Sequence, residues 1–277
     1  QLSEAKTEIR SQLDMIVLKR VIVAAIFIPL ILVVFYNGGY PLLALLSIFT
    51  FFGLYELRLL FKKKYGLIPI VVLPLGVIFL WLTPILGSIA TIFSLLFLLL
   101  IVAGYDIFLN RIDGAVIRIA LSLFVFIYQP FFYSYVFRLR NLPNGAYLLM
   151  SIIILIWLTD TAAYFLGMLL GKHRGIFKVS PKKSVEGFIS GIIFAFIGAF
   201  VLHRFISEWV TLPVMMLAAI SVAVFGQLGD LLESLIKRDT GVKDSSHIIP
   251  GHGGILDRFD SFIITVPVFY ILDILFI

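Results

Sequence analysis

Long apolar runs, most of them close to 20 residues, dominate this sequence and constrain what the chain can fold into. An α-helix needs roughly 20 mostly apolar residues to cross the ~30 Å hydrocarbon core of a bilayer. By this standard we predict about nine spans, near residues 21–36, 41–60, 67–84, 89–105, 115–137, 146–170, 186–206, 212–236 and 259–277. The predicted fold class is therefore all-α, a polytopic integral membrane helical bundle.

The composition agrees with a bilayer as the surroundings of this fold. Hydrophobic residues make up 61% of the 277 residues and charged residues 14%, whereas a soluble domain is about half apolar and about a quarter charged. A surface in water needs polar groups, and this chain has too few of them. We predict an N-terminal part, 1–150, of transmembrane helices for lipid binding or dimerisation, and a catalytic part, 151–277.

The positions of the basic residues predict the orientation of the chain. Only Arg138, Arg140 and Arg204 of the 22 Lys and Arg residues lie on one side of the predicted spans. Because short cytoplasmic loops are enriched in Lys and Arg, we expect a cytoplasmic N-terminus, and we expect the loops 171–187 and 237–258 on the cytosolic face of the cell membrane. This asymmetry explains the net charge of +6, so we expect no nucleic-acid partner.

Acidic residues inside or at the ends of apolar spans are the first sign of a functional site. Each costs at least ~2.5 kcal/mol at mid-bilayer unless it is hydrated or paired. Such residues are Asp160, Asp230, Glu233, Asp257 and Asp260. For Asp160, a role in lining a site and a buried polar contact between helices are equal alternatives.

Helical spacing gathers most of these carboxylates into two polar stripes. Positions three or four apart share a helix face, so Asp230 aligns with Glu233, Ser234 and Lys237, and Asp257 aligns with Asp260 and Ser261. Two such stripes can enclose a hydrated cavity in which a divalent cation relieves the repulsion between carboxylates. The alternative is a structural ion pair, such as Asp230 with Lys237, or Glu233 with Lys237 or Arg238.

Two basic loops accompany the stripes. In Gly171–Gly187, a helix that begins near Ser184 offers free N–H groups to an anion, and Lys182 and Lys183 add positive charge. Lys172 and Arg174 fit ordinary retention of positive charge on the cytosolic side. The second loop, Lys237–Asp260, contains His252 and closely spaced glycines that let backbone approach a phosphate. Without cysteine, a metal would need oxygen or His ligands, which favours a hard ion such as Mg²⁺.

The same residues resemble the signature of a known family. The first stretch runs Ser234-x-Ile236-Lys237-Arg238, Lys243-Asp244, Ser246, Ile249-Pro250, His252-Gly253-Gly254-Ile255 and Asp257-Arg258-Phe259-Asp260. It is similar to the motif of phosphatidate cytidylyltransferases, the CDP-diacylglycerol synthases. Ser180-Pro181-Lys182-Lys183-Ser184-x-Glu186-Gly187 and Asp160-Thr161-x-x-Tyr164 also resemble elements of this family. The resemblance covers about residues 150–277; the N-terminal half agrees only in its apolar spans.

The resemblance implies that CTP and phosphatidate react to CDP-diacylglycerol and pyrophosphate with a divalent metal. It implies Mg²⁺ ligands at Asp230 and Asp257; a second, monovalent cation is left open. We assign catalytic roles to Asp230, Asp257, Lys237, Lys243, His252 and Arg258, and substrate binding to Ser180, Lys182, Lys183, Ser184, Glu186, Asp160, Ser234, Arg238, Gly253, Gly254 and Asp260. We also expect a homodimer.

Two other functions remain as alternatives. One is a CTP-dependent lipid kinase of the polyprenol or phytol type, which would transfer the γ-phosphate instead of the nucleotide. The other is an ion-coupled transporter, because intramembrane Asp residues often mark transport paths. The absence of an inverted repeat in the sequence and the clustering of charge at one membrane face argue against the transporter.

Overall fold

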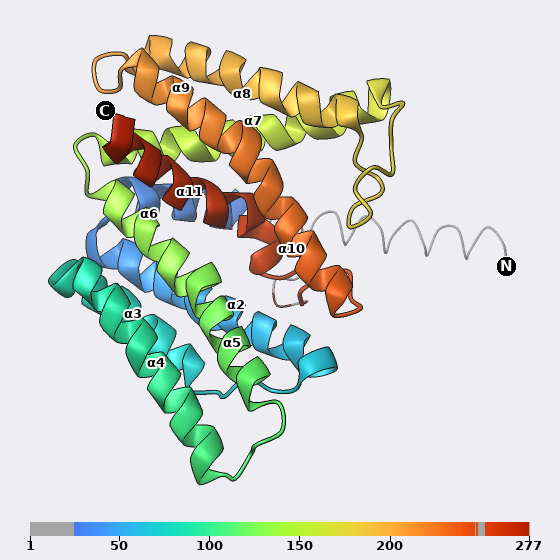
Figure 1. Cartoon of the computed structure of the whole chain (residues 1–277). Coiled ribbons are helices and arrows are strands. Elements are labelled where there is room, and N and C mark those ends of the chain that lie inside the picture. Colours follow the sequence, from blue (N-terminus) through green and yellow to red (C-terminus); the bar gives the residue numbers. More distant parts are fainter. Residues whose placement is uncertain (1–24, 247, 249–252, 277) are drawn as a thin grey trace, which may run out of the picture.

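The computed structural model describes residues 25–246, 248 and 253–276, and within these ranges every regular element is a helix (Figure 1). The elements are Ala25–Asn37, α2 (Gly39–Tyr65), α3 (Val72–Leu86), α4 (Ser88–Phe108), α5 (Ala115–Phe126), η1 (Ile127–Phe131), α6 (Phe132–Arg140), α7 (Gly145–Leu170), α8 (Val185–Ile206), α9 (Leu212–Ile220), η2 (Ser221–Gly226), α10 (Gln227–Asp239) and α11 (Leu256–Phe276). The predicted all-α class is confirmed.

The helices agree closely with the predicted spans. In the described part of the chain, 7 helical segments are long and apolar enough to cross a membrane, and two shorter apolar helices, Ala25–Asn37 and Val72–Leu86, accompany them. The segments α5–η1–α6 and α9–η2–α10 each run on as one span, Ala115–Arg140 and Leu212–Asp239. The chain is therefore a multi-pass helical membrane protein.

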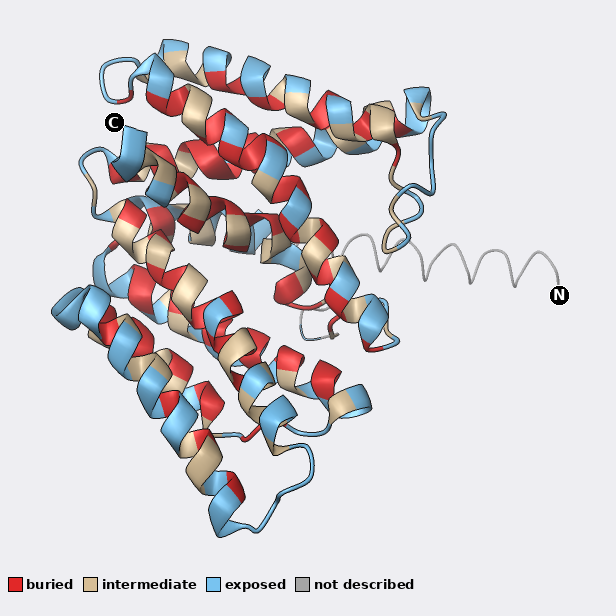
Figure 2. Ribbon diagram, viewed as in Figure 1, coloured by how far each residue is buried: buried red, intermediate tan, exposed pale blue. Residues whose placement is uncertain are grey.

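The outer surface of the bundle is apolar. Only 17% of the most apolar stretch of α4 is buried, and its exposed side chains include Ile92, Phe93 and Phe97. Figure 2 shows exposed residues along the outer faces of α4 and α8, while the buried residues line the inside of the bundle. Such exposed apolar surface is far larger than water-soluble proteins tolerate, whereas lipid chains solvate it.

The helices of the two halves share one core. The helix α11 packs against α6 as well as against α10, and the buried cluster includes Phe35 and Phe49 from the N-terminal half together with Phe262 and Phe269 from α11. The predicted division into 1–150 and 151–277 stays a prediction, because the packing is continuous across residue 150.

Glycine allows α10 and α11 to lie in direct contact. A Cβ atom on Gly229 would lie 2.5 Å from the backbone oxygen of Asp260, which is too close for any side chain. Since Gly229 precedes Asp230, this close approach brings an acidic residue of α10 beside an acidic residue of α11. The π-helical segment η2 directly precedes α10; such segments are frequent near functional sites.

The start of α8 is fixed by a side-chain cap and by close contact with α7. The Ser184 hydroxyl accepts a hydrogen bond from the Gly187 N–H at 3.1 Å, which confirms the predicted helix start near Ser184. A Cβ atom on Gly187 would lie 2.6 Å from the Ala163 carbonyl oxygen. The basic loop before α8 is therefore anchored against α7, where Asp160 lies.

We predict that Gly229→Ala lowers both the thermal stability of the purified protein and its catalytic activity. The added methyl group has to push α10 and α11 apart, and overpacking of this kind costs about 1–3 kcal/mol. Gly104→Ala is the matched control, because a Cβ at Gly104 in α4 meets nothing within 4 Å. Melting curves in detergent check this; equal melting temperatures for the two variants would contradict it.

Candidate active site

A cavity of about 1310 Å³ lies between helix Ala25–Asn37, α2, α7, α10 and α11. One part of its wall is apolar and includes Phe27, Ile28, Phe52, Ile153 and Trp157. Another part carries the charged residues Asp160, Arg174, Lys182, Lys183, Asp230, Asp257, Arg258 and Asp260. The cavity thus joins a surface suited to hydrocarbon with one suited to phosphate.

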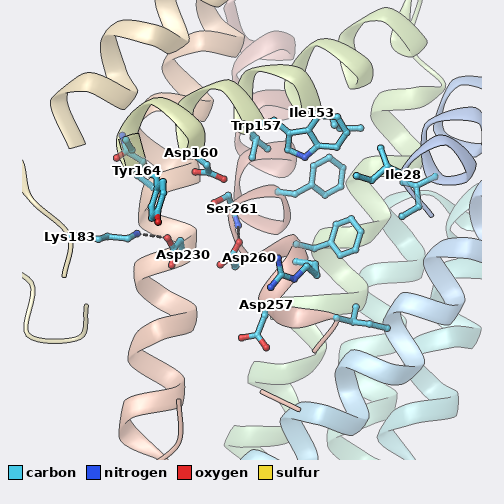
Figure 3. Close-up of a pocket in the computed structure, with 18 of the residues that line it drawn as sticks. Ile28, Ile153, Trp157, Asp160, Tyr164, Lys183, Asp230, Asp257, Asp260 and Ser261 are labelled. Atoms are coloured by element: carbon cyan, nitrogen blue, oxygen red, sulfur yellow. Dashed lines mark hydrogen bonds and ion pairs between the residues drawn. The ribbon is translucent and has the colours of Figure 1, made fainter. Parts of the chain in front are cut away.

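Carboxylates from three helices point into the charged part of the cavity (Figure 3). Asp160 comes from α7, Asp230 from α10 and Asp260 from α11, and in the close-up their side chains face the same space. The contact between α10 and α11 at Gly229 produces this arrangement. The structure therefore places Asp160 on the cavity wall, which favours the site-lining alternative.

Lys183 reaches this cluster from the loop before α8 and forms an ion pair with Asp230. Arg174 holds the loop in place: its guanidinium donates to the backbone oxygens of Gly167 at 2.7 Å and of Lys182 at 3.2 Å. Arg174 therefore has a structural role in addition to its positive charge. Its contacts keep Lys183 directed at α10.

Lys237 bridges α10 and α11. Its ammonium lies 2.6 Å from an Asp257 oxygen and 3.2 Å from a Glu233 oxygen. The side chain of Glu233 is only 2% exposed, and neither of its carboxylate oxygens has a hydrogen-bond partner. The structural ion pair considered as Asp230 with Lys237 is thus replaced by two other pairs, Asp230 with Lys183 and Asp257 with Lys237.

The second oxygen of Asp257 binds the chain that precedes α11. It accepts from the backbone N–H of Gly254 at 2.9 Å, the backbone N–H of Ser245 at 3.2 Å and the hydroxyl of Ser245 at 2.9 Å. These bonds, together with the one from Lys237, fix both oxygens of Asp257. Its orientation is therefore set before any substrate binds.

The structure brings together about half of the site residues predicted from the sequence. The cavity wall includes Asp160, Lys182, Lys183, Ser184, Asp230, Asp257, Arg258 and Asp260. Predicted residues that are described but lie outside this wall are Ser180, Glu186, Ser234, Lys237, Arg238, Lys243, Gly253 and Gly254. Among these, Lys237 and Gly254 touch Asp257 directly. His252 lies outside the described residues.

Two predicted substrate ligands have partners within the protein. The Glu186 carboxylate lies 2.6 Å from Nδ1 of His173. The Arg238 guanidinium donates to the backbone oxygens of Val179 at 3.3 Å and Val242 at 3.0 Å, so it ties the two basic loops together. Their roles in substrate binding stay predictions.

Two contributors to the site were missed in the sequence. Ser245 is adjacent to the predicted Ser246 and gave no separate signal. Glu56 of α2 is buried behind the segment that leads into α11 and accepts hydrogen bonds from it. The criterion that singled out Asp160, an acidic residue inside an apolar span, applies equally to Glu56 and would have found it.

The carboxylates suit a magnesium ion that arrives with a phosphate ligand. Among the described residues, no group of three or more Asp, Glu or His side chains is arranged to hold a metal ion. Mg²⁺ commonly binds through one or two carboxylates, with substrate phosphates and waters completing the octahedron. Asp230 and Asp257 offer such hard oxygen donors, and the buried Glu233 adds negative charge without hydrogen bonds. The residues therefore fit an ion shared with substrate better than a closed protein site.

Comparison with known proteins supports this interpretation of the site. A sequence model of the Cytidylyltransferase family matches residues 18–276. The chain belongs to this family. Proteins named phosphatidate cytidylyltransferase resemble this cytidylyltransferase along most of its length: those of Staphylococcus saprophyticus subsp. saprophyticus and Staphylococcus epidermidis are 35% and 36% identical to it, and that of Staphylococcus aureus (strain COL) is 32% identical. Each alignment covers 92% of this chain and 96% of the relative.

We predict that Lys237→Met destabilises this cytidylyltransferase far more than Lys64→Met does. Removing Lys237, whose side chain is 12% exposed, leaves Glu233 and Asp257 without their cation, and breaking a buried pair in this way costs about 3–5 kcal/mol. Lys64 pairs with Asp239 at 2.5 Å in an exposed position, where a pair contributes about 0–1 kcal/mol. Apparent melting temperatures in detergent measure the difference; equal losses would show that Lys237 stabilises nothing beyond a surface pair.

Proposed function

We propose that this cytidylyltransferase transfers CMP from CTP to phosphatidate, giving CDP-diacylglycerol and pyrophosphate. One observation carries the proposal: a single cavity has both an apolar wall and a cluster of lysines and carboxylates. A lipid with a phosphate head group and a nucleoside triphosphate need these two kinds of surface within reach of each other. The name shared by the relatives, phosphatidate cytidylyltransferase, agrees with this chemistry.

The reaction is an in-line displacement at phosphorus. A phosphate oxygen of phosphatidate forms a bond to the α-phosphorus of CTP, the bond from that phosphorus to the bridging oxygen breaks, and pyrophosphate leaves with the electron pair. Such reactions depend on positioning and on neutralisation of charge more than on covalent help from the protein. A cavity with fixed ammonium and carboxylate groups is suited to both tasks.

The residues on the charged wall divide between the two reactants. Lys182, Lys183 and Arg258 offset the negative charge of the phosphates. Asp230 and Asp257 would hold Mg²⁺, which when bound neutralises charge on the triphosphate, and Asp260 orients the polar groups beside them. The apolar wall from helix Ala25–Asn37, α2 and α7 holds the acyl chains of the lipid.

The same proposal includes the location of the enzyme. The excess of Lys and Arg on the predicted cytosolic side supports a multi-pass protein of the cell membrane whose charged cavity wall faces the cytoplasm. CTP is a cytosolic metabolite with several negative charges and cannot cross a bilayer unaided. A homodimer and the division of labour between 1–150 and 151–277 complete the proposal.

The test is the fate of the CTP label. Purified protein is incubated with phosphatidate, Mg²⁺ and CTP labelled at the α-phosphorus, and the lipid is separated by chromatography. We expect the label in CDP-diacylglycerol and expect none in the product of Asp257→Asn. A lipid labelled only from γ-labelled CTP would overturn the proposal in favour of a lipid kinase, and substrate flux into liposomes without nucleotide would favour a transporter.

We also predict that Lys183→Met lowers kcat/KM for CTP by roughly 10- to 100-fold. A hydrogen bond to a charged phosphate contributes about 1.5–3 kcal/mol, and each 1.36 kcal/mol corresponds to about a tenfold change in rate. Lys178→Met is the matched control, because Lys178 lies in the same loop and is exposed. Initial rates over a range of CTP concentrations measure the effect; a loss of the same size in the control would refute a specific role for Lys183.

A further inference from the structure

A carboxylate is buried completely within α2, in the half of the chain that carries no signature residues. Glu56 is 0% exposed although it lies inside an apolar membrane span, Gly39–Tyr65. A buried carboxylate is stable only when hydrogen bonds or cations replace its water. The partners of Glu56 therefore indicate why α2 retains it.

Four donors surround the Glu56 carboxylate, and all of them belong to the segment that leads into α11. One oxygen accepts from the Ser246 hydroxyl at 2.5 Å and from the Ile255 N–H at 2.9 Å. The other accepts from the Leu256 N–H at 3.0 Å and lies 3.2 Å from the Ser245 hydroxyl. The first N–H groups of a helix have no partner within the helix, so Glu56 caps α11 from a position about 200 residues earlier in the sequence.

The same backbone segment is held from its other side by Asp257. The Gly254 N–H donates to Asp257 at 2.9 Å, and the Ser245 hydroxyl, which has one proton, lies within hydrogen-bond distance of both carboxylates. A Cβ on Gly254 would lie 2.7 Å from each oxygen of Glu56, so only glycine fits between them. Glu56 and Asp257 thus grip one short stretch of chain between them.

We propose that Glu56 is a positioning residue of the active site: from α2 it fixes the start of α11 so that Asp257 is directed into the cavity. Glu56 does not contribute to the described cavity wall, and its oxygens are taken up by the four donors, so it acts through Asp257 and not on substrate. The proposal rests on the proposed function for its catalytic consequence. It also gives the N-terminal half a defined part in the reaction.

The first test compares Glu56→Gln with Asp106→Asn. Glutamine keeps the size of the side chain but turns one acceptor into a donor that faces donors. Asp106 is a matched control: it is a buried carboxylate of α4 that pairs with Arg118 at 2.9 Å, and α4 packs against α3 and α5. We expect Glu56→Gln to lower kcat at least tenfold with KM for phosphatidate within twofold, and Asp106→Asn to leave kcat within twofold.

Conservative changes separate positioning from general instability. Glu56→Asp keeps the charge and the acceptors, so we expect it to recover part of the kcat lost in Glu56→Gln. Ser246→Ala removes only one of the four donors and tests the same contact if Glu56→Gln does not fold. In the double variant Glu56→Gln/Ser246→Ala, kcat should equal that of Glu56→Gln alone, because both changes break one interaction.

Amide hydrogen exchange gives a readout that needs neither substrate nor turnover. In the unliganded protein, the peptide that covers residues 253–260 should exchange faster in Glu56→Gln than in the wild type, and at the wild-type rate in Asp106→Asn. The proposal is overturned if kcat of Glu56→Gln stays within twofold, if Asp106→Asn loses as much kcat, or if exchange at 253–260 is unchanged. If the wild type makes no CDP-diacylglycerol, the proposed function fails, whereas the exchange experiment still decides whether Glu56 holds this segment.

Discussion

The contact between α10 and α11 at Gly229 concentrates negative charge in the interior of a membrane protein, and the surrounding structure balances that charge. Asp230 and Asp260 are brought together because no side chain separates the two helices at this point. Carboxylates repel each other strongly where water is scarce. Lys183 answers Asp230, and Lys237 lies between Glu233 and Asp257. The negative charge that remains suits cationic partners of a triphosphate.

The cavity brings two reactants of opposite character to one point. Its apolar wall is formed by the side chains of helices that also face lipid, such as Phe27 and Trp157, which are both partly exposed. Its charged wall is built from the ends of α10 and α11 and from the loop before α8. A lipid phosphate can therefore approach from the membrane while a nucleotide approaches from water, and neither has to be fully transferred into the other's surroundings.

The position of α11 depends on both halves of the chain. Its side chains pack against α6, and its first N–H groups bind a carboxylate of α2. The apolar N-terminal spans are therefore more than a membrane anchor for a catalytic C-terminal part. A buried polar network of this kind enforces one arrangement, because each of its members left unpaired would be costly in a low-dielectric interior.

The sequence by itself determined the fold class, the number and approximate limits of the apolar helices, and the stretches that carry the chemistry. These follow from local rules: span length, helical periodicity, and the cost of placing charge in hydrocarbon. It also indicated Asp160, Asp230, Asp257 and Asp260 as residues of one site, since each acidic side chain inside or beside an apolar span needs a reason to be there.

Only the tertiary structure decided which charge pairs with which. Sequence spacing offered Lys237 as the partner of Asp230 on the same helix, whereas the folded chain pairs Asp230 with Lys183 from a distant loop and Lys237 with Asp257 of α11. Likewise, nothing near Glu56 in the sequence indicates that its donors lie about 200 residues away. Local spacing defines the faces of a helix, but contacts between helices depend on how closely their backbones approach, and here glycines at 229 and 254 set that distance.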